Sequence, residues 1–301
     1  EVPLVVTYYQ RGAPATGLPT RHGQSDLRFA MHAGHGEFPR IILCSGDIEE
    51  CFYDAARAFN YAERYQTPVI HLIDKALANS NKSCKMLNPQ MIKIERGQLL
   101  TEADVQGKEY KRYQLTESGV SPRLPLGTSG AIFWNTGDEH DEQGHISEEP
   151  MMRTRMYEKR MKKLETADKE IPVSERINFY GDPDASATVV SWGSPKGAVL
   201  EAIERLGKEG HKLSFLQVRM PHPLPKDYVA EVLGKAKKKI AVEGNYSAQL
   251  AGIIKENTGV DMDYLVLKWN GRPMSADEVY EALKLIMQDR APKRQVLTHG
   301  A

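Results

Sequence analysis

The order of apolar and polar positions divides the chain into two blocks joined by a charged bridge. In the first block, the apolar runs at 3–9, 40–44 and 68–73 have the length and composition of buried strands. Residues 48–65 lie between the second and third runs and repeat apolar side chains at helical spacing. Strand, helix and strand joined by short turns form a βαβ unit. This block therefore predicts a parallel sheet with helices on its faces.

The second block alternates regularly between strand and helix patterns. It predicts strands at 187–192, 212–218, 239–242 and 264–268, and helices at 195–207, 226–236, 247–257 and 276–288. Ser194 precedes Pro195, an order that suits the beginning of a capped helix. Ser275 has Glu278 three residues later, which is the spacing of a capping box. The expected fold is α/β with two domains, the second of them doubly wound.

Polar loops and a charged helix separate the two blocks. Residues 79–145 are rich in Gly, Pro and polar side chains, and loops of that length usually serve a function or an interface. Residues 151–169 predict a helix of mixed charge, which we interpret as a solvated bridge with ion pairs. The expected divisions are 1–147, a charged linker helix at 148–175, and 176–301. The polar tail from 289 is expected to be mobile or docked on a neighbour.

Composition narrows the function classes. The 40 Lys and Arg balance the 40 Asp and Glu, which removes the charge expected of a nucleic-acid or anionic-membrane binder. No apolar run approaches the roughly 20 residues that span a bilayer. Cys44, Cys51 and Cys84 are odd in number and lack CxxC spacing, which disfavours a disulfide framework, a zinc site or an iron–sulfur cluster on this chain alone. A reducing cytoplasm is the expected location.

The densest unusual stretch runs from Gln10 to His22, directly after the first predicted strand. Ligands of open α/β sheets bind beyond the carboxyl ends of strands. The guanidinium of Arg11 matches a carboxylate bidentately, and Thr16 and Thr20 each offer a hydroxyl. An ordinary turn with an exposed arginine also fits this spacing.

Several motifs occur in order along the chain. They read QRGxPxTGLPT from Gln10, QxDL from Gln24, HGExP from His35, AFNxAExxQTPVI from Ala58, TGxEHDExG from Thr136, SWGS from Ser191 and EGNYxxQL from Glu243. Together they resemble the alpha subunit of 2-oxoacid:ferredoxin oxidoreductases over essentially the whole chain.

The resemblance implies an enzyme that uses thiamine diphosphate to decarboxylate a 2-oxo acid, such as pyruvate or 2-oxoglutarate, in the presence of coenzyme A. It would form an acyl-CoA and CO2 and pass electrons to ferredoxin. The implied fold is the later part of the pyrimidine-facing thiamine-diphosphate domain, incomplete at its N-terminus, followed by a transketolase-C-like domain. A beta subunit would hold the diphosphate, its Mg²⁺ and a [4Fe–4S] cluster, in an assembly of alpha–beta pairs.

The resemblance also implies roles for individual residues. Arg11 matches the arginine that receives the substrate carboxylate, and Thr20 matches a threonine near the substrate. Holding the carboxylate is physically reasonable, because decarboxylation requires it to be oriented before its charge moves onto the cofactor. Four residues are expected to support this loop: Gly12, Thr16, Gly17 and His22. No catalytic residue and no metal site are assigned to this chain.

The beginning of the chain departs from the family pattern. It has no signal peptide and no initiator Met, so we expect either processing or an upstream segment. The family's YPITP-like motif and its activating glutamate do not occur here. Glu1 begins a strand that should follow that region, so we do not assign it as the activating acid.

Other interpretations stay open. The chain is alternatively a structural or assembly subunit, or a subunit of another thiamine-diphosphate enzyme. The stretch from Glu139 to His145 resembles a metal site in composition, but we interpret it as a loop.

Glu243, Gly244 and Asn245 follow a predicted strand, and we expect them to contact another subunit. The preferred 2-oxo acid is not predicted.

Overall fold

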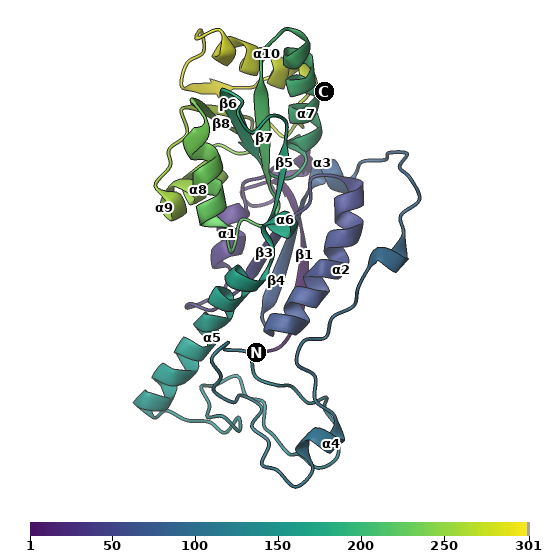
Figure 1. Cartoon of the computed structure of the whole chain (residues 1–301), viewed down its shortest axis with the longest axis vertical. Helices are drawn as coiled ribbons and strands as arrows, with labels where there is room; N and C mark the ends of the chain where they lie inside the picture. The colour runs from purple at the N-terminus through teal and green to yellow at the C-terminus, as the bar shows by residue number, and fades with distance from the viewer. Residues whose placement is uncertain (300–301) are drawn as a thin grey trace.

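The computed structural model describes residues 1–299, which form two β-sheets arranged along the long axis of the molecule (Figure 1). The first sheet has the strand order β2-β1-β4-β3, and the second has the order β10-β9-β8-β6-β7-β5. The strands are β1 (Leu4–Gly12), β2 (Leu18–His22), β3 (Ile41–Cys44), β4 (Pro68–Asp74), β5 (Ile177–Tyr180), β6 (Ala187–Ser191), β7 (Leu213–Val218), β8 (Lys238–Glu243), β9 (Tyr264–Leu267) and β10 (Arg294–Val296). The helices are α1 (Leu27–His32), α2 (Ile48–Tyr65), α3 (Lys75–Ala78), the 3₁₀ turn η1 (Pro89–Met91), α4 (Glu102–Val105), α5 (Pro150–Glu170), α6 (Val173–Arg176), α7 (Pro195–Lys208), α8 (Lys226–Lys235), α9 (Gln249–Thr258) and α10 (Ala276–Met287).

The first sheet confirms the predicted βαβ unit. Both β1 and β3 pair in parallel with β4, and α2 has the predicted limits. Asp47 fixes the beginning of α2, because its carboxylate accepts a 2.8 Å hydrogen bond from the backbone N–H of Glu50. The pattern of apolar and polar residues did not predict β2, which runs antiparallel to β1.

The second sheet confirms the four predicted strands and four predicted helices, with limits that shift by at most two residues. The capping box of Ser275 and Glu278 is present at the beginning of α10. The cap predicted for Ser194 is wrong, since its side chain makes no capping hydrogen bond. Its backbone N–H instead donates to the carboxylate of Asp74 in the first sheet.

Two edge strands were missed in the second sheet. β5 pairs antiparallel with β7, and β10 pairs in parallel with β9. The expectation of a mobile or neighbour-docked tail is therefore wrong for residues 294–296. The open edge of β9 offers backbone donors and acceptors, which a short polar segment can satisfy without a hydrophobic pattern of its own.

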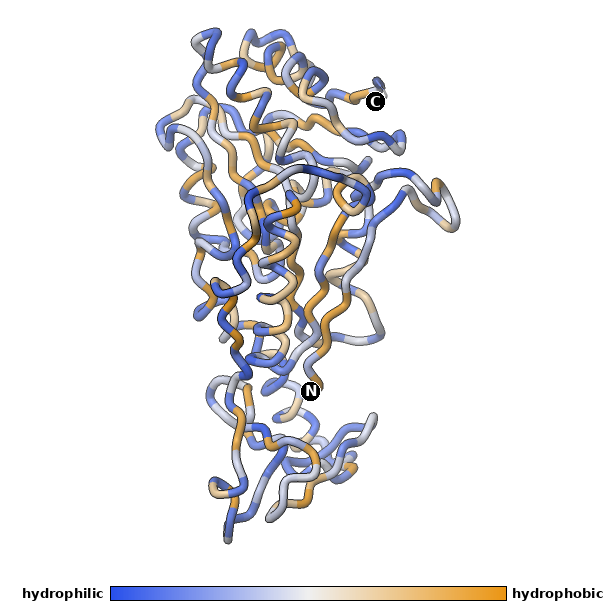
Figure 2. The backbone as a smooth tube through the Cα atoms, turned by 90° about the vertical axis from the view of Figure 1, so that its right-hand side faces the viewer, coloured by the Kyte–Doolittle hydropathy of each residue, from blue (hydrophilic) through white to orange (hydrophobic). Residues whose placement is uncertain are grey.

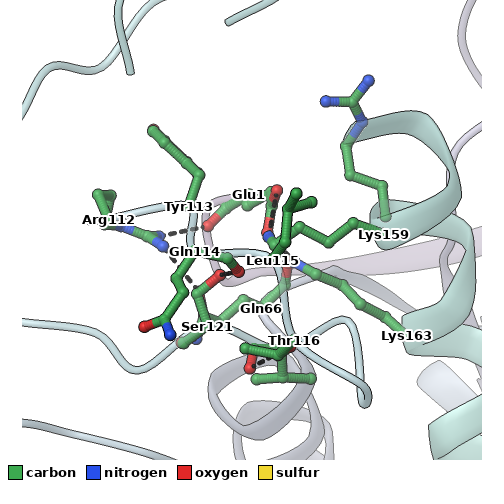
Figure 3. A network of polar contacts seen from close by, with 12 residues as sticks. Glu1, Gln66, Arg112, Tyr113, Gln114, Leu115, Thr116, Ser121, Lys159 and Lys163 are labelled. Carbon is green, nitrogen blue, oxygen red and sulfur yellow. Dashed lines mark hydrogen bonds and ion pairs between the residues drawn. The ribbon is translucent and has the colours of Figure 1, made fainter. Parts of the chain in front are cut away.

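Helix α5 confirms the charged helix but corrects its interpretation as a solvated bridge. Lys159 and Lys163 are buried, and both extend toward the carboxylate of Glu1, with N–O distances of 2.7 and 2.5 Å (Figure 3). Lys163 also donates to the carbonyl of Gln66 at the end of α2. One face of α5 thus packs on the first sheet, where two lysines are held by a buried anion.

The two sheets share a hydrophobic core. Its largest cluster combines Ile42 and Leu72 of the first sheet with Trp192, Leu216 and Val218 of the second-sheet region. Figure 2 shows the hydrophobic runs following the central strands. The second sheet is therefore packed against the first rather than tethered to it. The expected divisions at 147 and 175 stay a prediction.

The long loops were predicted correctly as largely irregular backbone. Between α3 and α5, the only helices in the described chain are η1 and α4. The segment leaves α3 beside α2, and its part around α4 lies at the end of the molecule opposite α10 (Figure 1). In residues 1–299, the helices are either too short or too polar to cross a membrane.

Candidate functional site

The stretch from Gln10 to His22 forms a β-hairpin rather than a free loop. β1 continues through Gly12, the chain turns, and β2 returns so that Arg11 lies opposite His22 and Gly12 opposite Leu18. Gly17 occupies the turn with a φ of +47°, and a Cβ there would lie 2.2 Å from the carbonyl oxygen of Gly12. A side chain at this position cannot fit the observed turn, so the glycine sets the hairpin's shape.

The hairpin separates the two residues expected to contact substrate. Arg11 is half-buried, and its guanidinium donates to the backbone carbonyl of Thr16, which folds the arginine onto its own turn. Thr20 is exposed and lines a cleft, together with His22. Arg11 does not line this cleft. The two roles stay predictions.

His22 and Asp74 join the hairpin to the neighbouring elements. His22 is 6% exposed, and its Nδ1 lies 3.4 Å from Oδ1 of Asp74, an ion-pair distance without hydrogen-bond geometry. Asp74 is fully buried at the end of β4 and accepts backbone hydrogen bonds from Leu77 and Ser194. Burial alone would raise the pKa of Asp74, but His22 and these N–H donors lower it. A buried carboxylate therefore connects β2, α3 and α7.

Gln24 makes a second connection between the two sheets. Its amide donates to Asp74 and to the carbonyl of Trp192, and its oxygen accepts from the backbone N–H of Gly244. Asn245 donates to the Gln24 carbonyl. The predicted subunit contact at residues 243–245 is thus corrected, because these residues contact the first sheet of the same chain.

Glu243 of the same motif stabilises helix α9. Its buried carboxylate accepts hydrogen bonds from the backbone N–H groups of Leu250 and Ala251, in the first turn of α9. Trp192 also donates to it, at 3.3 Å. A carboxylate at a helix N-terminus satisfies free N–H groups and complements the helix dipole.

The cleft lies where the carboxyl ends of both sheets meet. Its volume is about 670 Å³. The first sheet contributes residues after β3 and β4, such as Asp47 and Lys75. The second contributes residues after β6 and β9, such as Ser194 and Arg272. This is the edge at which ligands of parallel α/β sheets bind.

A buried charge network, which we did not predict from the sequence, holds α2 against the second sheet. Asp54 of α2 accepts hydrogen bonds from Arg219 and Ser45. Glu50 accepts from Lys196 at 2.6 Å and from Gln217 at 2.8 Å. In the sequence, this network shows only as polar residues at positions of α2 and β7 that would be expected to be apolar. That pattern does not show which residues pair with one another.

His71 of β4 extends the charge network. Its Nε2 lies 2.7 Å from Oγ of Ser45, which also donates to Asp54. Burial, together with the nearby positive charge of Arg219, lowers the pKa of His71 to about 4. His71 is therefore neutral at physiological pH.

The stretch from Glu139 to His145 is occupied by loop contacts. Glu139 pairs with Arg160 at 2.6 Å and with Arg153. Burial would raise the pKa of Glu139, but the two arginines lower it to about 2. Asp141 accepts three backbone N–H groups, from Gln143, Gly144 and His145. Within residues 1–299, no group of three or more His, Cys, Asp or Glu side chains is placed to hold a metal ion.

The three cysteines lie in different environments. Cys44 is buried in the shared core, Cys51 is half-buried, and Cys84 is exposed. Burial raises the pKa of the Cys51 thiol to about 11, so it is protonated at neutral pH.

Comparison with protein families matches both sheets. Residues 1–159 match the model for "Pyruvate flavodoxin/ferredoxin oxidoreductase, thiamine diP-bdg", and residues 185–279 match "Pyruvate:ferredoxin oxidoreductase core domain II". The chain belongs to the 2-oxoacid:ferredoxin oxidoreductase alpha-subunit family. The predicted resemblance and the two-domain α/β fold are thereby confirmed.

Relatives of this oxidoreductase family match the chain over its length. The 2-oxoacid:ferredoxin oxidoreductase subunit alpha of Saccharolobus solfataricus is 50% identical over 302 residues, covering 100% of this chain and 47% of that protein. The 2-oxoglutarate synthase subunit KorA of Methanothermobacter thermautotrophicus is 29% identical, covering 93% of this chain and 72% of that protein. The chain spans about half the length of the first of these relatives.

A solved relative has the same fold. The 2-oxoglutarate:ferredoxin oxidoreductase of Magnetococcus marinus, with 2-oxoglutarate, coenzyme A and succinyl-CoA bound, superposes with a TM-score of 0.85 at 34% identity. The alignment covers 94% of this chain and 48% of that one. The two sheets are thus arranged as in that relative.

Proposed function

We propose that this chain is part of an enzyme that converts a 2-oxo acid and coenzyme A into an acyl-CoA and CO2, and passes the two released electrons singly to ferredoxin. Pyruvate and 2-oxoglutarate are the candidate substrates. The observation that carries this proposal is the similarity over 100% of the chain to an alpha subunit of that name, with the Arg11 hairpin at the carboxyl end of the first sheet.

Within this reaction, Arg11 binds the substrate carboxylate. Its contact with the Thr16 carbonyl uses one nitrogen of a guanidinium that has five N–H donors, so others stay available to a carboxylate. Gly12 and Gly17 give the turn the shape that places the Thr16 carbonyl against Arg11. Thr20 offers its exposed hydroxyl to the substrate, and His22 anchors β2 beside Asp74.

The proposal divides the cofactors between subunits. Residues 1–159 match a thiamine-diphosphate-binding model, so this chain forms one wall of that site. Among residues 1–299, no carboxylate, histidine or cysteine cluster suits Mg²⁺ or a [4Fe–4S] cluster. The assignment of the diphosphate, Mg²⁺ and the cluster to a beta subunit, in alpha–beta pairs, rests on the resemblance to the family and is part of the proposal. Thiamine diphosphate supplies the nucleophilic carbon and the electron sink for decarboxylation.

Reconstitution with the beta subunit tests this proposal. The pair should reduce ferredoxin in the presence of a 2-oxo acid and coenzyme A, and either subunit alone should be inactive. Reduction of NAD instead of ferredoxin would indicate another thiamine-diphosphate enzyme, and failure of both acceptors would contradict the proposal.

A structural role is the second candidate. Large apolar side chains are exposed in the long-loop segment, among them Leu126, Ile132 and Trp134, and such residues favour contact with another subunit. A beta subunit that is fully active without this chain would establish the structural role. Loss of turnover without this chain, together with loss of carboxylate affinity in an Arg11 variant, would exclude it.

A further inference from the structure

The strand that carries Thr20 is weakly held within its own sheet. β2 pairs with β1 at only two register positions, and the register shifts between them. Four of the five β2 residues are exposed. A short hairpin with so few ladder hydrogen bonds is only marginally stable in water. The position of β2 therefore depends on contacts outside the first sheet.

The second sheet supplies these contacts through three glycines. Gly193, Gly244 and Gly271 follow β6, β8 and β9, which are adjacent strands. The carbonyl of Gly271 accepts a 3.1 Å hydrogen bond from the backbone N–H of His22. A Cβ on Gly271 would lie 2.5 Å from the side chain of Leu18. The second sheet thus approaches β2 more closely than a side chain at this position permits.

Gln24, two residues after β2, fills the space between the other two glycines. A Cβ on Gly193 would lie 2.4 Å from its side-chain nitrogen, and a Cβ on Gly244 would lie 2.7 Å from its side-chain oxygen. Gln24 is fully buried. The two glycines, one in the SWGS motif and one in the EGNYxxQL motif, therefore form a slot that fits a glutamine amide.

Each hydrogen-bonding group of Gln24 has a partner in this slot. Its side-chain nitrogen donates to the Trp192 carbonyl at 3.0 Å and to Asp74 at 3.2 Å. Its side-chain oxygen accepts from the N–H of Gly244 at 2.8 Å, and its backbone N–H donates to the Gly244 carbonyl at 3.0 Å. Its own carbonyl accepts from Asn245 at 3.3 Å. A buried polar residue with all its groups paired specifies one position of the chain.

We propose that Gln24 is a positioning residue for binding of the 2-oxo acid. Held between Gly193 and Gly244, it fixes β2 against the second sheet. β2 carries Thr20 and pairs with the part of β1 that carries Arg11, so both substrate contacts follow its position. The second sheet thus acts on substrate binding without touching the substrate. The identity of the substrate rests on the proposed function; the slot and its contacts do not.

Steady-state kinetics of the chain with its beta subunit test this role. Gln24→Asn shortens the side chain by one methylene, so its amide cannot reach all of its partners. Gly244→Ala adds a methyl group against the amide, at a backbone φ outside the left-handed region. Each variant should raise the KM for the 2-oxo acid about fivefold and change kcat by less than about twofold. Gly207→Ala is the matched control, because its Cβ would meet open space.

The two changes should not add, because both disturb the same contact. The double variant Gln24→Asn/Gly244→Ala should raise KM no more than about twofold beyond the larger single effect. A merely structural role predicts a different result, since partial unfolding lowers the apparent kcat and leaves KM unchanged. A loss of kcat at constant KM, unchanged kinetics, or fully additive effects would each overturn the proposal.

Hydrogen exchange tests the position of β2 without relying on activity. In both single variants the backbone amides of β2 should exchange faster, whereas those of β4 should keep the parent rate. Unchanged exchange in β2 overturns the proposal, as does exchange that rises equally along the chain. If the parent complex turns over no 2-oxo acid, the proposed function fails. Faster exchange confined to β2 then still supports Gln24 as the residue that positions this strand.

Discussion

Asp74, the last residue of β4, accepts a 2.9 Å hydrogen bond from the backbone N–H of Ser194, the residue before α7. This bond crosses from one sheet to the other at the edge where their carboxyl ends meet. Because the same carboxylate faces His22 of the hairpin, the position of the proposed substrate-binding hairpin depends on the contact between the sheets.

Replacing Asp74 should loosen this junction. Asp74→Asn removes a buried charge that several donors satisfy, and charge-assisted hydrogen bonds contribute about 1.5–3 kcal/mol each. We expect a loss of about 2–4 kcal/mol in the free energy of unfolding, measured by urea denaturation. Asp261→Asn, which removes an exposed partner of Lys255, should cost less than about 1 kcal/mol. Equal losses in the two variants would contradict the role of Asp74.

Gly17 should be essential for the shape of the hairpin. Gly17→Ala introduces a Cβ that would collide with the Gly12 carbonyl, at a positive φ that alanine rarely adopts. We expect faster backbone hydrogen exchange in β2, together with reduced substrate affinity. Gly36→Ala is the matched control, because Gly36 also has a positive φ but has open space around its Cα. Slow exchange in the Gly17 variant would show that the turn tolerates a side chain.

Arg11 should determine the affinity for the 2-oxo acid. Arg11→Ala should reduce kcat/KM by about 30- to 150-fold, since a charge-assisted bidentate contact contributes about 2–3 kcal/mol. Arg11→Lys should recover only part of the lost kcat/KM, because an ammonium group cannot form the planar bidentate contact that a guanidinium makes with a carboxylate. Arg155→Ala removes an exposed charge of α5 and serves as the control. Unchanged kinetics in the Arg11→Ala variant would remove Arg11 from the site.

His71 should make stability depend on pH. Its pKa is about 4 when folded and about 6.5 when unfolded, so between these values the unfolded chain binds more protons. Stability should therefore fall as the pH decreases from 6.5 to 4, by up to about 1.4 kcal/mol per pH unit. His222, whose pKa burial also lowers to about 4, adds a similar effect.

A His71 variant isolates the contribution of His71 to this slope. Urea denaturation of His71→Gln across this pH range should give a shallower slope than the parent chain. His211→Gln changes a histidine that is not buried and should retain the parent slope. If His71→Gln also retains the full slope, His71 is not the group responsible.

Local patterns determined most of the secondary structure. The apolar period of α2 and the capping residues of α10 depend only on neighbours in sequence, and both were predicted with correct limits or nearly so. The family could also be recognised from the sequence, because its motifs are short and contiguous. The strands β2, β5 and β10 were missed or unassigned, since each is an edge strand whose partner, not its own pattern, provides the stabilising hydrogen bonds.

The sequence by itself determined the elements, the family and the candidates Arg11 and Thr20. Tertiary structure alone decided which charges are buried and which are free. Lys163 and Arg219 look like ordinary surface cations in sequence, yet each is buried against a carboxylate from a distant segment. Arg272 and Lys82 look the same but line a cleft, where neither forms an ion pair with any carboxylate of residues 1–299. The physical reason is that the energy of a charge depends on its solvation and on its nearest counter-charge, and folding sets both through contacts between residues far apart in the chain.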